Sequence, residues 1–151
     1  MGLFNFFKKK DESIDQTTID ELVVFSKQAI ALAIPEIEKT KSFLPFGAIL
    51  TNDGIFEQVV YLDPNKKIID HREHATIVQK LIKEKFKEPK CRLVFMSFDG
   101  IAHLPTGDID SINVRVSNKS KSIHRLLTYP YKIVNKKVEL IDKDNPIMKD
   151  I

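Results

Sequence analysis

The run from Arg92 to Phe98 is almost continuously apolar, and it constrains the fold of this chain more than any other segment. A strand that faces water on one side alternates apolar and polar residues, whereas an unbroken apolar run is typical of a strand buried on both faces. We therefore place this run at the centre of a sheet. A chain of 151 residues, 42 % of them hydrophobic, can supply such a core within one domain.

Two segments have the pattern of helices. The first begins with Thr18 and Glu21, which form a capping box, and apolar residues then recur every three or four positions up to Ile37. Pro35 falls inside this pattern and predicts a kink or a break. The second helix begins after Asp70, with Glu73 completing another capping box, and we expect it to end near Lys87.

The remaining segments have the pattern of strands. Residues 46–51 and 55–62 flank an Asn-Asp-Gly turn and predict a hairpin, and alternation from Ser111 predicts a half-buried antiparallel strand. Pro130 interrupts a further strand over 122–131 and suggests an edge or a bulge, and a last hairpin is expected around Asn135 and Lys136. The order α-β-β-α-β-β-β, with one further strand as an option, predicts an α+β fold. We expect a mostly antiparallel sheet of about five strands with two helices on one face.

The expected domain organisation is simple. Residues 1–16 are interpreted as an arm and polar linker, 17–142 as the single α+β domain, and 143–151 as a polar tail. The first residues are apolar and precede a run of lysines, which is the reverse of a secretory signal, and the apolar run is too short to span a bilayer. Cys91 is the one cysteine, so no internal disulfide can form. We expect a cytoplasmic protein.

Three short motifs occur in the order Pro45-Phe46-Gly47-Ala48, then Asp53-Gly54, then His71-Arg72-Glu73 at a helix start. Through these motifs the stretch from Phe46 to Leu81 resembles the core of the zinc-dependent nucleobase deaminases. The resemblance implies His71 as a zinc ligand and Glu73 as the proton shuttle. That chemistry also needs a Pro-Cys-x-x-Cys turn, which this chain lacks. We therefore predict no metal site, no cofactor and no catalytic residues, and keep His71 and Glu73 as the alternative.

Cys91 lies between Lys90 and Arg92, whose charges would lower the pKa of its thiol. A lone cysteine at the start of a buried strand nevertheless indicates packing rather than a nucleophile. His103 and His124 are isolated in the sequence, and we interpret both as surface or loop residues.

The segment from Ser111 to Val138 is basic and contains no acidic residue. If the strands alternate as predicted, part of this charge shares one open face or edge of the sheet. Such a face, with tyrosines, suits an acidic protein partner, where Tyr and Arg make good anchors. It also suits single-stranded nucleic acid, which we rank second, and a solvated face is the simplest alternative. The candidate binding residues are Arg115, Lys119, Lys121, Arg125, Tyr129, Tyr131 and Lys132.

The segment from Leu44 to Ala48 and the late pair Pro130-Tyr131 resemble motifs of small bacterial cytosolic α+β proteins. Some proteins of that build serve as immunity partners of secreted toxins, which implies a binding module. We therefore expect a non-catalytic, protein-binding module of immunity type. The alternative function is a nucleotide- or nucleobase-acting enzyme with a degenerate deaminase-like site.

Overall fold

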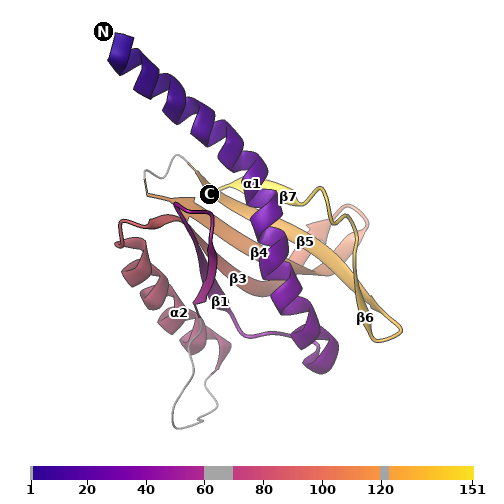
Figure 1. Ribbon diagram of the computed structural model, residues 1–151. Helices are drawn as coiled ribbons and strands as arrows, with labels where there is room; N and C mark the ends of the chain where they lie inside the picture. The colour runs from indigo at the N-terminus through magenta and orange to yellow at the C-terminus, as the bar shows by residue number, and fades with distance from the viewer. Residues whose placement is uncertain (1, 60–69, 120–122) are drawn as a thin grey trace.

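A computed structural model describes the backbone of residues 2–59, 70–119 and 123–151, and side chains from residue 20 onward within those ranges. The predicted α+β class is confirmed, and these described residues form two helices and seven strands (Figure 1). The elements follow the order α1 (Gly2–Thr40), β1 (Phe46–Thr51), β2 (Phe56–Val59), α2 (His71–Phe86), β3 (Cys91–Leu104), β4 (Gly107–Asn118), β5 (His124–Val134), β6 (Lys137–Leu140) and β7 (Ile147–Asp150).

All of the strand pairs are antiparallel, and the order across the sheet is β2-β1-β3-β4-β5-β6. The predicted central strand is confirmed, because β3 lies between β1 and β4 and its residues from Leu93 to Ser97 are buried. The sheet has more strands than the five expected, because two short strands share the outer edge of β5. Strand β7 pairs with 125–128 and β6 pairs with 131–134.

The two helices lie on opposite faces of the sheet, so the prediction that both cover one face is wrong. In β1, Phe46, Ala48 and Leu50 belong to the core beneath α1. The residues between them point the other way, since a Cβ added at Gly47 would lie 2.5 Å from Ile82 Cδ1 of α2. The physical reason is the central strand itself, because β3 is buried on both faces and needs cover from both sides.

The core consists of two clusters, one on each face. The larger one joins α1 to the sheet, and its largest fully buried side chains are Tyr129, Tyr131 and Phe95. The smaller cluster joins α2 to the sheet through Ile49, Val59, Val78, Ile82, Cys91, Val94 and Met96. Figure 1 shows α1 crossing the sheet, with its N-terminal part extending past it.

Helix α1 is continuous from Gly2 to Thr40, so the predicted arm and linker over 1–16 and the helix start at Thr18 are wrong. Residues 11–16 contain neither Gly nor Pro, so nothing there interrupts the helical backbone. Pro35 lies inside the helix without ending it. Glu21, predicted to cap a helix start, instead forms an ion pair with Arg92 of β3.

The C-terminal segment belongs to the sheet, so the prediction of a polar tail over 143–151 is wrong. Strand β7 pairs with β5 in the register Arg125↔Asp150 to Thr128↔Ile147. The Arg125 side chain adds an ion pair to Asp150, with Nε 3.3 Å from Oδ1. The edge of β5 that β6 leaves free is thereby covered.

Both predicted turns are confirmed. Gly54 has a positive φ of 84°, and Asn135 and Lys136 have positive φ values of 51° and 65°, as a two-residue hairpin requires. A Cβ added at Gly54 would meet nothing within 4 Å, so only backbone conformation opposes a substitution there.

We expect Gly54→Val to lower the free energy of unfolding by about 1–2 kcal/mol, because a β-branched residue is strained at positive φ. Gly54→Asn is the matched control, since asparagine tolerates this conformation better and should lose less. Urea denaturation of the three proteins measures the difference. Equal stability of all three would mean that the turn does not require a positive φ.

Candidate protein-binding groove

Neither helix that the structure describes covers half of one face of the sheet. Helix α2 packs on β1, β2 and β3. In β4 and β5, every second residue belongs to the core cluster beneath α1, and the residues between them point to the α2 side of the sheet. The helices that the structure describes do not cover these side chains on the α2 side. These residues are Asn113, Arg115 and Ser117 of β4 and His124, Leu126 and Thr128 of β5.

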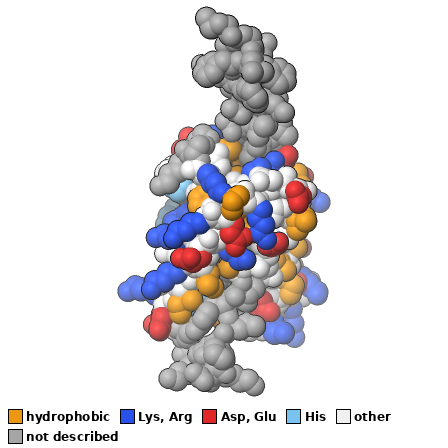
Figure 2. Space-filling model, turned by 60° about the vertical axis from the view of Figure 1, so that its left-hand side comes forward, with side chains coloured by type: hydrophobic (Ala, Val, Ile, Leu, Met, Phe, Trp, Pro, Cys, Tyr) orange, Lys and Arg blue, Asp and Glu red, His pale blue; other side chains and the backbone are white. Residues whose placement is uncertain are grey.

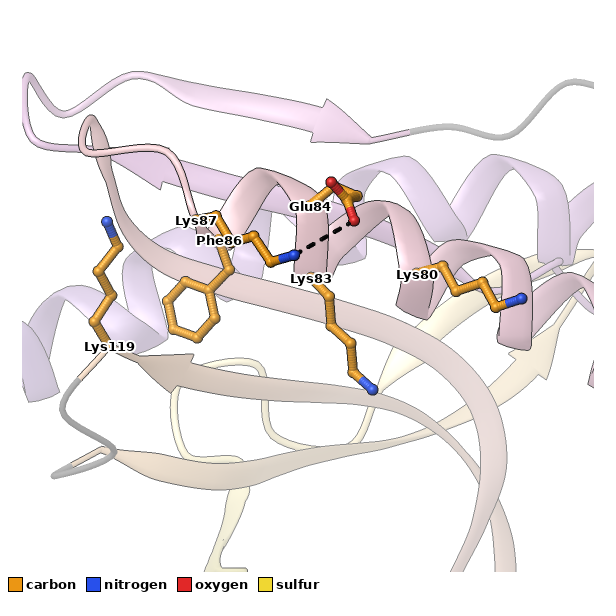
Figure 3. A pocket seen from close by; sticks show the side chains of 6 residues that line it. All are labelled: Lys80, Lys83, Glu84, Phe86, Lys87 and Lys119. Atoms are coloured by element: carbon orange, nitrogen blue, oxygen red, sulfur yellow. Dashed lines mark ion pairs between the residues drawn. The ribbon is translucent and has the colours of Figure 1, made fainter.

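Two adjoining hollows of about 480 and 470 Å³ follow the border between α2 and this open part of the sheet. They share Lys83 and Phe86, so they form one shallow depression, which we call the α2 groove. Figure 3 shows the Lys83 and Lys119 side chains on either side of the Phe86 ring. The groove is lined by Gln79, Lys80, Ile82, Lys83, Glu84, Phe86, Lys87, Val94, Phe95, Met96, Arg115, Ser117 and Lys119.

The amphipathic pattern of α2 positions its lysines along the groove. The helix begins at the predicted cap, where Asp70 Oδ1 accepts a hydrogen bond of 2.8 Å from the Glu73 amide. Val78 and Ile82 are buried against the sheet. Lys80, Lys83 and Lys87 are exposed and follow the spacing i, i+3, i+7, which places them in one stripe along the helix.

The groove has a basic rim and an apolar floor. Among the described residues, four lysines and Arg115 line it, and Glu84 is the one acidic residue. Glu84 pairs with Lys87 at 3.7 Å, but both side chains are about three-quarters exposed, so water screens this pair. Figure 2 shows Lys and Arg side chains over the surface of the molecule, with acidic side chains between them. Phe86, Val94 and Met96 provide the apolar part of the lining.

Two cations of the groove are held in place by neighbours. The Arg115 guanidinium lies 5.8 Å from the centre of the Phe98 ring, within the range of a cation–π contact. The Lys119 ammonium donates a hydrogen bond of 2.6 Å to the carbonyl of Glu88, just beyond the end of α2. Lys119 is nevertheless exposed, so its charge stays available to a partner.

The structure brings together only part of the predicted binding set. Arg115 and Lys119 line the α2 groove. Arg125 pairs with Val116, which places it on the α1 side of the sheet, where it contacts Met148 and Asp150 of β7. Lys132 is exposed opposite Glu139 of β6, beyond the residues that line the groove. Lys121 lies outside the described residues.

The tyrosines are core residues, so the prediction that they serve as surface anchors is wrong. Tyr129 is 0 % and Tyr131 2 % exposed. The Tyr129 hydroxyl hydrogen-bonds Ser26 of α1 at 2.5 Å, and burial raises its pKa. Burial and the neighbouring Asp99 carboxylate raise the pKa of Tyr131 to about 12. Both rings therefore hold α1 on the sheet.

The lysines of α2 that line the groove were not among the candidate binding residues predicted from the sequence. Their i, i+3, i+7 spacing is visible in the sequence, but the pattern shows only that they face away from the helix's own core. The exposed stripe borders β4 because the sheet order places β4 beside β3, and the helix pattern does not reveal that order.

The deaminase-like residues do not form a recognisable site. His71 and Glu73 are exposed on the first turn of α2. Within 20–59, 70–119 and 123–151, whose side chains the structure describes, no three His, Cys, Asp or Glu residues are grouped so that they could hold a metal ion. Asp99, which follows the buried part of β3, hydrogen-bonds Tyr131, and burial raises the pKa of its carboxyl.

Two further sequence interpretations are corrected. The pKa of the Cys91 thiol is raised, because burial outweighs the neighbouring lysines, so the expected lowering is wrong. His124 is not isolated, since its Nδ1 lies 2.5 Å from Ser117 Oγ on the strand beside it. This cross-strand pair lies at the edge of the α2 groove.

Comparison with protein-family models, with curated proteins and with solved structures finds no match for this chain. We therefore infer function from the geometry and charge of the α2 groove. Neither helix, over the residues described, has a stretch long and apolar enough to cross a membrane.

Proposed function

We propose that this protein is a non-catalytic, cytoplasmic binding module that holds an acidic surface of another protein in the α2 groove. An immunity-type protein, which neutralises a toxin by binding it, is the specific form of this proposal. The observation that carries it is the lining of the groove, where four lysines and an arginine surround an apolar floor and one acidic residue opposes them. Such a surface steers an acidic partner by charge and binds it by apolar contact.

The aromatic residues favour a protein over a single-stranded nucleic acid. Sequence-tolerant binding of single strands uses exposed aromatic rings on which successive bases stack. Tyr129 and Tyr131 are buried, and the ring of Phe98 lies beneath Arg115. Among the described residues that line the groove, Phe86 is then the one aromatic residue with part of its surface exposed. A single ring offers little for base stacking, but it suits the contact of one apolar side chain.

A nucleotide- or nucleobase-acting enzyme is the alternative, and it would rest on His71 and Glu73. Both are on an exposed helical turn outside the groove, and the Glu73 amide takes part in the helix cap. Neither of them lines the α2 groove. The geometry therefore favours the binding module.

The triple variant Lys83→Glu, Arg115→Glu, Lys119→Glu should lose its partner. Wild-type protein with an affinity tag is used to capture proteins from an extract of the source cell, and the partner is identified, purified and titrated. We expect the variant to bind this partner at least about a hundredfold more weakly, because charge reversal replaces attraction by repulsion at three sites. The melting temperature should change little, since exposed charges contribute little to stability.

The matched control reverses three exposed lysines outside the groove, Lys39, Lys132 and Lys143, and should bind the partner nearly as well as the wild type. Equal loss in both variants would show that net charge, not the groove, determines binding and would contradict the proposal. Preferential binding of unrelated oligonucleotides, with affinity falling linearly against salt on a log–log plot, would replace it by nucleic-acid binding.

A further inference from the structure

We propose that the segment of the partner that fills the α2 groove is an acidic amphipathic α-helix, lying alongside α2 over β4. This inference rests on the proposed function and names the chemistry of the partner. Three features of the groove support it: its width, the pairing of its strands and the spacing of its lysines.

The uncovered strip of the sheet has room for a helix. Strands in a sheet are about 4.8 Å apart. Strands β4 and β5, with the short strands β6 and β7 beyond them, therefore present a strip about 15 Å wide. A helix with its side chains has a diameter of about 10–12 Å. On the opposite face, α1 already packs over β4. A second helix on this face would lie beside α2 and complete the layer.

The strands beneath the groove cannot accept a further strand. Strand β3 pairs with β1 and β4, and β4 pairs with β3 and β5, so the backbone groups of both are used within the sheet. An extended segment laid across them would leave its own N–H and C=O groups without backbone partners. A helix satisfies these groups internally, so it can dock by side chains alone.

The lysine stripe of α2 matches acidic residues on a neighbouring helix. Lys80 and Lys87, with Lys83 between them, are seven positions apart, which corresponds to about 10 Å along the helix axis. Acidic side chains at i, i+3 or i+4, and i+7 on a partner helix would repeat at the same distances. Lys80 and Lys83 form no ion pair with any side chain that the structure describes, so no described carboxylate neutralises their charges.

The partner helix would carry an apolar stripe next to its acidic one. Phe86 and Met96 line the floor of the groove beside the lysine stripe, and both belong to or pack against the smaller core cluster. Leucine or isoleucine residues on the stripe next to the acidic one would extend this cluster. Arg115, on the sheet side, would meet a further acidic residue at the flank of the helix.

The test uses two fluorescent peptides of 18 residues and identical composition. One places Glu at i, i+4, i+7 and i+11 with Leu on the adjoining stripe, and the other has the same residues permuted so that no stripe forms. We expect the first peptide to bind at least about tenfold more tightly than the second by fluorescence anisotropy, because only it presents both stripes at once. Its far-UV circular dichroism should show a gain of helix on binding.

The double variant Lys80→Glu, Lys83→Glu should bind the first peptide at least about tenfold more weakly than the wild type does. The control variant Lys39→Glu, Lys143→Glu should bind this peptide with nearly unchanged affinity. Equal binding of both peptides, binding without gain of helix, or no binding of either would overturn the helical occupant. If the natural partner still depends on Lys83, Arg115 and Lys119 in that event, the proposed function stands without this inference. If that partner ignores the three substitutions, the proposed function itself falls.

Discussion

Replacing Tyr129 with alanine is expected to lower the free energy of unfolding by about 3–5 kcal/mol, the range for removing a large aromatic side chain from a core. Tyr129 is fully buried beneath α1, and its hydroxyl hydrogen-bonds Ser26 of that helix at 2.5 Å. The substitution would leave a cavity between α1 and β5 and remove the bond that joins them. We therefore expect the packing of α1 on the sheet to be the part of the fold that this substitution weakens most.

Tyr129→Phe separates the two contributions, because it keeps the ring and removes only the hydroxyl. We expect this variant to lower the free energy of unfolding by about 1 kcal/mol, the net contribution of one buried hydrogen bond. Ser26 Oγ would keep its bond of 2.9 Å to the Val23 carbonyl. Urea denaturation measures both variants. A loss below about 1 kcal/mol for Tyr129→Ala would contradict the buried position of the ring and support a tyrosine on the surface.

Gly47→Val is expected to destabilise the protein by about 3 kcal/mol, at the upper end of the range for overpacked cores. A Cβ at this position would lie 2.5 Å from Cδ1 and 2.6 Å from Cγ1 of Ile82, and 3.4 Å from Cγ1 of Val78. Valine adds two more methyl groups to that space. Helix α2 would have to move away from β1, which would open the smaller core cluster.

The double variant Gly47→Val, Ile82→Ala identifies the clash. Ile82→Ala alone should lose about 2–5 kcal/mol through the cavity it leaves. The valine at 47 would fill part of this cavity. The double variant should therefore lose less free energy of unfolding than the two single variants lose in sum. Strict additivity of the two free energies would show that α2 does not pack on Gly47.

The central strand was the most predictable part of the fold, and it also held the information that corrects the placement of the helices. An apolar run on both faces of Arg92 to Phe98 requires cover on both faces. Two helices on one face could not provide that cover. The alternation within β1 then decides which residues meet which helix.

The basic face was predicted from the sequence only in part, because adjacent residues in a strand point to opposite sides. Arg115 and Arg125 both lie in the acid-free segment, but Arg115 faces the open side and Arg125 pairs with Val116 on the side of α1. The alternation of Leu127, Tyr129 and Tyr131 could have placed the tyrosines in the core. The lysines of α2 come from a distant segment, and only the pairing of β3 with β4 brings them beside Arg115.

Site-specific photo-crosslinking shows whether a partner occupies the α2 groove. The photoreactive residue p-benzoylphenylalanine replaces Gln79, which is exposed in the groove, or Val24, which is 58 % exposed on α1 across the sheet. Each protein is irradiated with the purified partner. We predict a covalent complex from position 79 and none from position 24. Crosslinking from position 24 and not from position 79 would contradict the assignment of the groove as the binding site.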